Sequence, residues 1–134
     1  MKPELQNLYN HAKEATNNAY APYSKFRVGA AVLTEDGEIF KGCNVENASY
    51  GGTICAERSA IVSAISQRGK IKIKAIAVAT GQETPGAPCG ICRQVISEFG
   101  PNAPVVYIGK SGLVSRPINE LLVDAFTDFE SEVA

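Results

Sequence analysis

The sequence predicts an α/β fold of three layers, in which helices cover both faces of a mixed central sheet of about five strands. Helical patterns alternate with short apolar runs along the chain, and one pair of runs flanks a tight Asp-Gly turn. A two-residue turn joins antiparallel strands, whereas strands joined through a helix are most simply parallel. Both kinds of connection are present, which predicts a mixed sheet. A chain of 134 residues suits one domain, residues 1–134, with one core.

The composition narrows the classes of function. The hydrophobic share of 45% is ordinary for a globular protein, and the net charge of -1 offers no basic surface for a nucleic-acid backbone. No secretory signal is visible and no apolar run approaches the roughly 20 residues that span a bilayer. We therefore expect a cytoplasmic protein that acts on a small molecule, without nucleic-acid or membrane partners. Four cysteines in that setting favour metal or catalytic use over disulfides.

The N-terminal third predicts a helix followed by a hairpin. Apolar residues recur at helical spacing from residue 3 to about residue 18: Leu5, Leu8, Tyr9, Ala12 and Ala15. Phe26 to Thr34 predicts a buried strand, in which Gly29 would let another backbone or a substrate approach closely. Asp36-Gly37 predicts the turn, and Glu38 to Cys43 predicts the returning strand.

The middle of the chain predicts a loop, a helix and a central strand. Asn44 to Ile54 is polar and predicts a loop, and Thr53 is a candidate cap for the next helix. Cys55 to Gln67 predicts that helix, which Gly69 ends. Ile71 to Thr80 is apolar enough for a strand in the middle of the sheet.

The C-terminal third repeats the helix–strand alternation. Gly81 to Pro88 predicts a flexible loop, and Cys89 to Phe99 predicts a helix closed by Gly and Pro. Pro104 to Ile108 predicts a strand, and Ile118 to Phe126 predicts a short helix before an acidic tail. These runs assign four strands of the expected sheet.

Three cysteines and one glutamate form the candidate metal site. Cys89 and Cys92 have the spacing that places two sulfurs on one metal, and Cys55 supplies a third. Thiolate ligands suit Zn²⁺, and a set of three leaves the fourth tetrahedral position for water, as in catalytic zinc sites. Glu57 stands two residues from a ligand, where a carboxylate can move that water's protons.

The cysteines also allow two other interpretations. Cys43 could close a structural site of four sulfurs, but it ends an apolar strand and reads better as a small buried residue. A redox pair at Cys89 and Cys92 would leave Cys55 and Glu57 without a role. The single histidine, His11, lies in the first predicted helix and is expected at the surface. The whole constellation therefore favours a catalytic zinc bound by three cysteines.

Three thiolates around Zn²⁺ leave a net negative charge that weakens the metal as a Lewis acid. Both cysteine motifs stand at helix N-termini, whose free amides favour anions. Arg58 follows Cys55 by three residues, so it shares its helix face and can donate to the sulfur. Arg93 directly follows Cys92, and a surface or interface salt bridge is at least as good an account of it.

These motifs resemble those of the zinc-dependent nucleobase and nucleoside deaminases. Two further blocks, Ser24–Ala31 and Asn44–Tyr50, are similar to blocks of the cytidine deaminase family, in its small homotetrameric three-cysteine type. The similarity runs from about Tyr23 to Phe126 and covers most of the chain. It implies the cytidine-deaminase-like α/β/α fold, one Zn²⁺ per chain, and a free nucleoside as substrate.

The resemblance also implies roles for individual residues. Glu57 would shuttle protons while a zinc-activated water attacks C4 of the pyrimidine and ammonia leaves. The substrate-binding residues would be Asn44 and Glu46 at the ribose, Phe26 against the ring and the backbone of Ala56 at the base. Arg58 would contact the ligating sulfurs, as the matching arginine does in similar deaminases.

The resemblance further implies a homotetramer whose active sites are shared between subunits. Residues matching Tyr50 and Phe126 reach a neighbour's pocket in that type, although Val123 here replaces a common proline close to Phe126. The expected reaction is hydrolysis of cytidine and 2′-deoxycytidine to the uridine forms, a step of pyrimidine salvage. The alternatives are a deaminase of another aminopyrimidine nucleoside, of the blasticidin type, and a zinc-stabilised binding module without catalysis.

Overall fold

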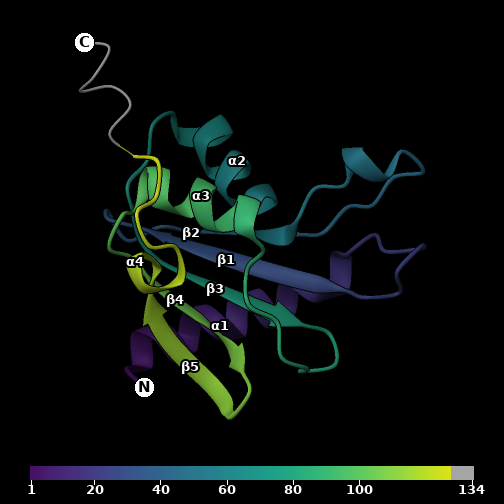
Figure 1. Ribbon diagram of the computed structural model, residues 1–134, viewed down its shortest axis with the longest axis horizontal. Coiled ribbons are helices and arrows are strands. Elements are labelled where there is room, and N and C mark those ends of the chain that lie inside the picture. Colours follow the sequence, from purple (N-terminus) through teal and green to yellow (C-terminus); the bar gives the residue numbers. More distant parts are fainter. Residues whose placement is uncertain (128–134) are drawn as a thin grey trace.

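The computed structural model describes residues 1–127, which form a five-stranded sheet with helices on both faces (Figure 1). The strands lie in the order β2-β1-β3-β4-β5. Their bounds are Val28–Thr34 for β1, Ile39–Cys43 for β2, Ile73–Thr80 for β3, Pro104–Gly109 for β4 and Gly112–Pro117 for β5. The helices are α1 at Pro3–Ala15, α2 at Ala56–Arg68, α3 at Gly90–Phe99 and α4 at Ile118–Leu121, with single 3₁₀ turns at Thr16–Asn18 and Tyr50–Gly52. The predicted three-layer architecture and mixed sheet are confirmed.

The strand directions follow from the connections. β1 pairs antiparallel with β2, its hairpin partner, and antiparallel with β3 on its other side. β3 and β4 are linked through α3 and pair in parallel, as the crossover predicts. This arrangement brings the N-terminal ends of α2 and α3 to the same face of the sheet (Figure 1).

Alternate residues of the central strands supply two separate cores. On β1, Ala30 and Val32 pack with α2 and α3, whereas Ala31 and Leu33 pack with α1 on the opposite face. On β3, the larger Ile76 and Val78 face α2 and α3, and the alternating alanines face α1. Both faces of the sheet are therefore apolar, which accounts for the continuous hydrophobic runs in the sequence.

Four details of the predicted elements are wrong. The loop between β1 and β2 has three residues, 35–37, and not the two of the predicted Asp36-Gly37 turn, because Thr34 N–H donates to the Glu38 carbonyl at 2.9 Å and Gly37 N–H donates to the Thr34 carbonyl at 3.0 Å. The predicted helix Ile118–Phe126 ends at Leu121, because Leu122 is extended (φ -138°, ψ 94°) and Asp124 is left-handed (φ 57°). The edge strand β5 was not assigned, since it is largely exposed and carries little apolar periodicity. Cys55, rather than Thr53, is the N-cap residue of α2.

Among residues 1–127, helices long and apolar enough to span a membrane are absent.

Two glycines let helix backbones lie directly on the sheet. A Cβ atom on Gly29 would stand 2.1 Å from the Ala12 carbonyl oxygen of α1. A Cβ atom on Gly42 would stand 2.3 Å from the Ala60 backbone nitrogen of α2. The close approach predicted at Gly29 is therefore made by a helix backbone.

Gly29→Ala is expected to lower the free energy of unfolding by about 3 kcal/mol, because the added methyl group must push α1 off the sheet. Gly51→Ala is the matched control, since a Cβ there meets no described atom within 4 Å, and its effect should stay within about 0.5 kcal/mol. Chemical denaturation at fixed protein and zinc concentration measures both. Equal midpoints for the two variants would show that α1 does not pack on Gly29.

Candidate active site

The sulfurs of Cys55, Cys89 and Cys92 lie within 4.8 Å of one another. Cys55 is the N-cap residue of α2 and Cys89 is the N-cap residue of α3, both with extended backbone. Cys92 lies in the first turn of α3 and is fully buried. The two helix starts thus bring together thiols that are more than thirty residues apart in sequence.

The cluster fits a zinc ion. Zn–S bonds of about 2.3 Å in tetrahedral geometry separate the sulfurs by about 3.8 Å, which is compatible with the observed spacing. Cys55 and Cys89 both stand at helix N-termini, whose positive dipole ends favour the negative charge of thiolates. Cys43 stands outside this cluster, beside Ala15 and Ser59, and burial raises the pKa of its thiol. The structure therefore brings together three thiols, not the four of a closed site.

Arg58 contacts the cluster from α2. Its Nη2 donates to Cys55 Sγ at 3.4 Å, at the helical spacing that predicted a sulfur contact. Hydrogen bonds from Cys92 and Arg58 lower the pKa of Cys55 to about 5, against the effect of burial. The Cys92 thiol, which donates to Cys55 and is buried, has a raised pKa. The Nε of Arg58 is buried without a partner among the described residues.

Glu57 is a buried carboxyl group in the first turn of α2, with 4% of its surface exposed. Burial first, and then the charge on Cys55, raise the pKa of Glu57 to about 7, against the opposing effects of a backbone hydrogen bond and Arg58. A carboxyl group with a pKa near neutrality can accept and donate a proton at neutral pH. The burial of Glu57 and this pKa are compatible with the proton-carrying role predicted for it.

One cavity of about 260 Å³ joins the cysteine cluster to most of the other predicted site residues. The predicted residues on its wall are Phe26, Asn44, Glu46, Cys55, Ala56, Glu57 and Cys89. The remaining wall comes from residues to which no substrate role was assigned from the sequence: Ser24, Val28, Thr53, Val78, Thr80, Gly86 and Ala87. Gly86 and Ala87 belong to the loop before Cys89, which was predicted only as flexible.

Asn44 uses its amide to fasten the start of β1. Its Oδ1 accepts from the Val28 backbone N–H at 2.9 Å, and its Nδ2 donates to the Phe26 carbonyl at 2.8 Å. The side chain is buried, with 8% of its surface exposed. One amide hydrogen and one lone pair remain for a ligand. This structural role of Asn44, in addition to the predicted binding of a ribose, could not be predicted from the sequence.

Glu46 organises the loop that forms one wall of the cavity. Its Oε1 accepts from the backbone N–H groups of Tyr23 at 3.0 Å and Ser24 at 3.1 Å, and the Ser24 hydroxyl donates to Oε2. These bonds, the hydroxyl first, lower the pKa of Glu46. The Phe26 N–H in turn donates to Ser24 Oγ at 3.0 Å. The carboxylate is thus ionised, and it lines the same cavity as Phe26, which is 42% exposed.

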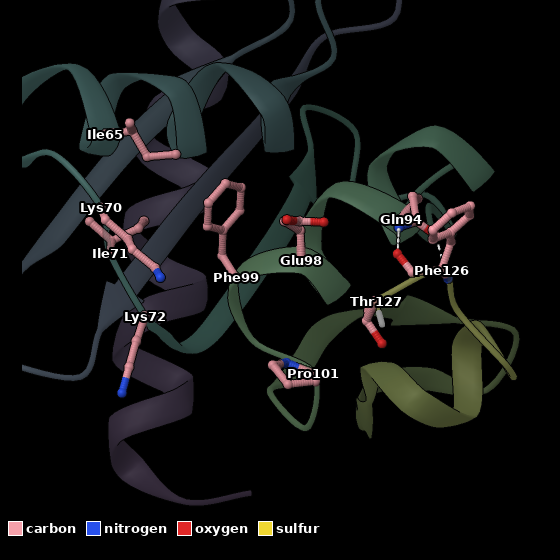
Figure 2. A pocket seen from close by; sticks show the side chains of 10 residues that line it. All are labelled: Ile65, Lys70, Ile71, Lys72, Gln94, Glu98, Phe99, Pro101, Phe126 and Thr127. Atoms are coloured by element: carbon pink, nitrogen blue, oxygen red, sulfur yellow. Dashed lines mark hydrogen bonds between the residues drawn. The ribbon is translucent and has the colours of Figure 1, made fainter. Parts of the chain in front are cut away.

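Tyr50 and Phe126 occupy different places in the chain's own structure. Tyr50 is 76% exposed and stands edge-on to Tyr23, with ring centroids 5.8 Å apart, in a hollow that adjoins Glu46. Phe126 is 63% exposed and lines a separate hollow with Ile65 and Phe99 (Figure 2). The structure therefore brings Tyr50 near the cavity and places Phe126 elsewhere. The acidic tail predicted after Phe126 lies outside the described residues except for its first residue, Thr127.

Two other predictions need correction. Arg93 is half-buried and donates to two backbone carbonyls, and the ion pairs among residues 1–127 do not include it, so the surface salt bridge considered for it is not found. The interface salt bridge considered beside it stays a prediction. His11 is also half-buried rather than exposed, and it lies on α1, on the face of the sheet opposite α2 and α3 (Figure 1). The histidine therefore takes no part in the cysteine site.

Comparison with known proteins places this site in a family. The model of the cytidine and deoxycytidylate deaminase zinc-binding region matches residues 2–108. The cytidine deaminase of Sporosarcina psychrophila is 45% identical over 126 residues, which cover 92% of each chain. That of Halalkalibacterium halodurans is 46% identical over 126 residues, covering 92% of this chain and 95% of the other.

Solved structures agree. The crystal structure of cytidine deaminase from Mycobacterium tuberculosis superposes with a TM-score of 0.82 at 39% identity, covering 93% of this chain and 98% of the other. That from Burkholderia pseudomallei gives 0.81 at 46% identity, covering 94% and 100%. The cysteine cluster, the buried Glu57 and these similarities lead to one conclusion: the chain belongs to the zinc-binding cytidine and deoxycytidylate deaminase family.

Proposed function

We propose that this protein catalyses the zinc-dependent hydrolytic deamination of free cytidine and 2′-deoxycytidine to uridine, 2′-deoxyuridine and ammonia. The observation that carries the proposal is the single cavity shared by the cysteine cluster, Glu57 and polar groups suited to a sugar. Relatives that are called cytidine deaminase over more than nine-tenths of the chain support the choice of substrate.

Cys55, Cys89 and Cys92 would hold the zinc, with Arg58 withdrawing charge from Cys55. A zinc ion held there would supply Lewis acidity: it would lower the pKa of a water from 15.7 towards ~7 and so prepare that water to attack C4 of the pyrimidine. A carboxylate oxygen of Glu57 takes one proton from this water and delivers it to N3 of the ring. Glu57 then carries the second proton to the amino group, which leaves as ammonia. The sum of these transfers is cytidine plus water giving uridine plus ammonia.

The remaining wall residues hold the nucleoside. The exposed face of Phe26 packs against the pyrimidine, and the Ala56 backbone hydrogen-bonds the base. The ionised Glu46 accepts from a ribose hydroxyl, and Asn44 offers its remaining amide hydrogen to another. Because Glu46 also anchors Tyr23 and Ser24, sugar recognition and the shape of the loop depend on one carboxylate.

The proposal includes a homotetramer, in the cytoplasm, in which Tyr50 and Phe126 reach a neighbouring subunit's cavity. Support comes from their high exposure and from the position of Phe126 away from its own cavity. Light scattering measures the assembly directly. A monomer with full activity would contradict the shared site.

The alternatives account for less of the structure. A zinc-stabilised binding module needs the three cysteines but has no use for a buried carboxyl group with a pKa of about 7 beside them. A deaminase of the blasticidin type would share the metal site, but the residues Asn44 and Glu46 suit a ribose. Measuring turnover, and on which substrate it occurs, distinguishes these alternatives from a cytidine deaminase.

The test is the ultraviolet change on incubation with cytidine, 2′-deoxycytidine and blasticidin S, with zinc quantified on the same sample. Turnover of both cytidine substrates with about one zinc per chain is the expected result. Zinc with turnover of the third compound alone would establish the blasticidin reading. Zinc without any turnover would establish the binding module.

A further inference from the structure

Arg93 connects two segments that are far apart in the sequence. Its Nε donates to the Pro88 carbonyl at 2.7 Å, and its Nη1 donates to the Leu121 carbonyl at 2.8 Å. Within residues 1–127 its guanidinium has no carboxylate partner. A half-buried arginine that serves two backbone carbonyls fixes the backbone, because its planar donors hold both acceptors in one geometry.

The Pro88 carbonyl belongs to the peptide unit that carries the backbone nitrogen of Cys89. Because that unit is planar, a contact that fixes the carbonyl also fixes the direction in which Cys89 begins. Pro88 is fully buried, and it ends a stretch without regular structure between β3 and α3. Cys89 is the N-cap residue of α3: its backbone is extended (φ -69°, ψ 171°), and its carbonyl accepts the first helical hydrogen bond, from the Arg93 N–H at 2.9 Å. The helix therefore holds Cys89 on its carbonyl side, and the Arg93 side chain holds the peptide unit on its nitrogen side.

The neighbouring residue ties the same C-terminal segment to α3. Gln94 Nε2 donates to the Phe126 carbonyl at 2.7 Å, and the Phe126 N–H donates to Gln94 Oε1 at 3.2 Å (Figure 2). The consecutive side chains of Arg93 and Gln94 thus hydrogen-bond the C-terminal segment at Leu121 and at Phe126. The C-terminal segment and the loop before Cys89 are joined through one turn of α3.

We propose that Arg93 is a positioning residue for the zinc site. Its side chain keeps Cys89 in the orientation in which the sulfur binds zinc, and its second contact, to Leu121, anchors the same guanidinium to the C-terminal segment. The inference rests on the proposed function, in which Cys89 is a zinc ligand. Removal of the guanidinium frees the Pro88–Cys89 peptide, so that the Cys89 sulfur leaves the metal more often. Zinc is then lost faster from a protein that is still folded.

The experiment measures the rate at which a chromogenic chelator removes zinc from the loaded protein at a temperature where circular dichroism shows it folded. Arg93→Met keeps the length of the side chain without its donors, and zinc release should be at least about 10-fold faster. Arg93→Lys retains one cationic donor, and its rate of zinc release should lie between those of the parent and Arg93→Met. Arg68→Met is the matched control, since Arg68 is an exposed partner of Glu38 at the end of α2, and its release rate should equal that of the parent.

Two readouts separate the possible outcomes. Co²⁺ in place of zinc should show an altered thiolate charge-transfer band in Arg93→Met and an unchanged band in Arg68→Met. Faster hydrogen exchange after Leu121 with an unchanged rate of zinc release would mean that Arg93 only holds the C-terminal segment, which would overturn the inference. A parent protein that binds no zinc would instead refute the proposed function.

Discussion

Glu57→Gln is expected to retain zinc and to lose turnover on cytidine by about 10³-fold, since general acid–base catalysis of this kind contributes 10²–10⁴-fold. The amide has the volume of the carboxyl group and fits the same buried place, but it cannot accept a proton from water. The other cavity residues are unchanged, so the effect should fall on kcat more than on KM. Steady-state kinetics on the zinc-loaded variant measures both constants.

The control is Glu120→Gln, the same exchange at an exposed position in α4. It should match the parent in rate, zinc content and thermal midpoint. If Glu57→Gln holds one zinc per chain and turns over cytidine at a near-normal rate, Glu57 is not the proton carrier. The same pair of variants also distinguishes the enzyme from a zinc-stabilised binding module, because a binding module predicts that neither glutamate affects any measured property.

The layers of the fold and the pairing of its central strands could be predicted because they depend on local patterns. The Asp-Gly turn fixes the β1–β2 hairpin, and a helix-length crossover fixes the parallel β3–β4 pair. The edge strand β5 could not be found this way, because its pairing with β4 depends on a partner rather than on its own apolar pattern. The end of α4 likewise carries a contact that local patterns do not reveal, since the Leu121 carbonyl accepts from Arg93, which lies 28 residues earlier.

In the candidate site, too, the features set by local sequence could be predicted and those set by tertiary contacts could not. Cysteine spacing and the approach of Arg58 to Cys55 follow from helix geometry, so sequence alone could suggest them. The amide of Asn44 on the backbone of Phe26 and Val28 joins two loops whose relative position only the folded sheet defines. The contacts of Arg93 could not be predicted for the same reason, since its partners are backbone carbonyls that carry no residue-type signal.

Cys92→Ser is expected to abolish turnover and to lower zinc affinity by more than about 100-fold, the upper range for changes in groups that merely support a ligand. A serine hydroxyl is a harder donor than a thiol and does not ionise at neutral pH, so it replaces the buried sulfur poorly. Loss of zinc also removes the stabilisation that binding adds, about 4 kcal/mol when zinc stands at 1,000 times its dissociation constant. Zinc titration and thermal unfolding in matched buffers measure both effects.

Cys43→Ser is the internal control, because it makes the same exchange at the one cysteine of the described chain that lies outside the cluster. A catalytic site of three thiols predicts that this variant keeps its zinc and its rate, whereas a closed site of four would lose affinity in both variants alike. Chelation of the parent should lower its thermal midpoint to that of Cys92→Ser and should leave Cys92→Ser itself unchanged. A Cys92→Ser protein that keeps one tightly bound zinc and normal turnover would show that the metal is held elsewhere, and the three clustered sulfurs would then need another explanation.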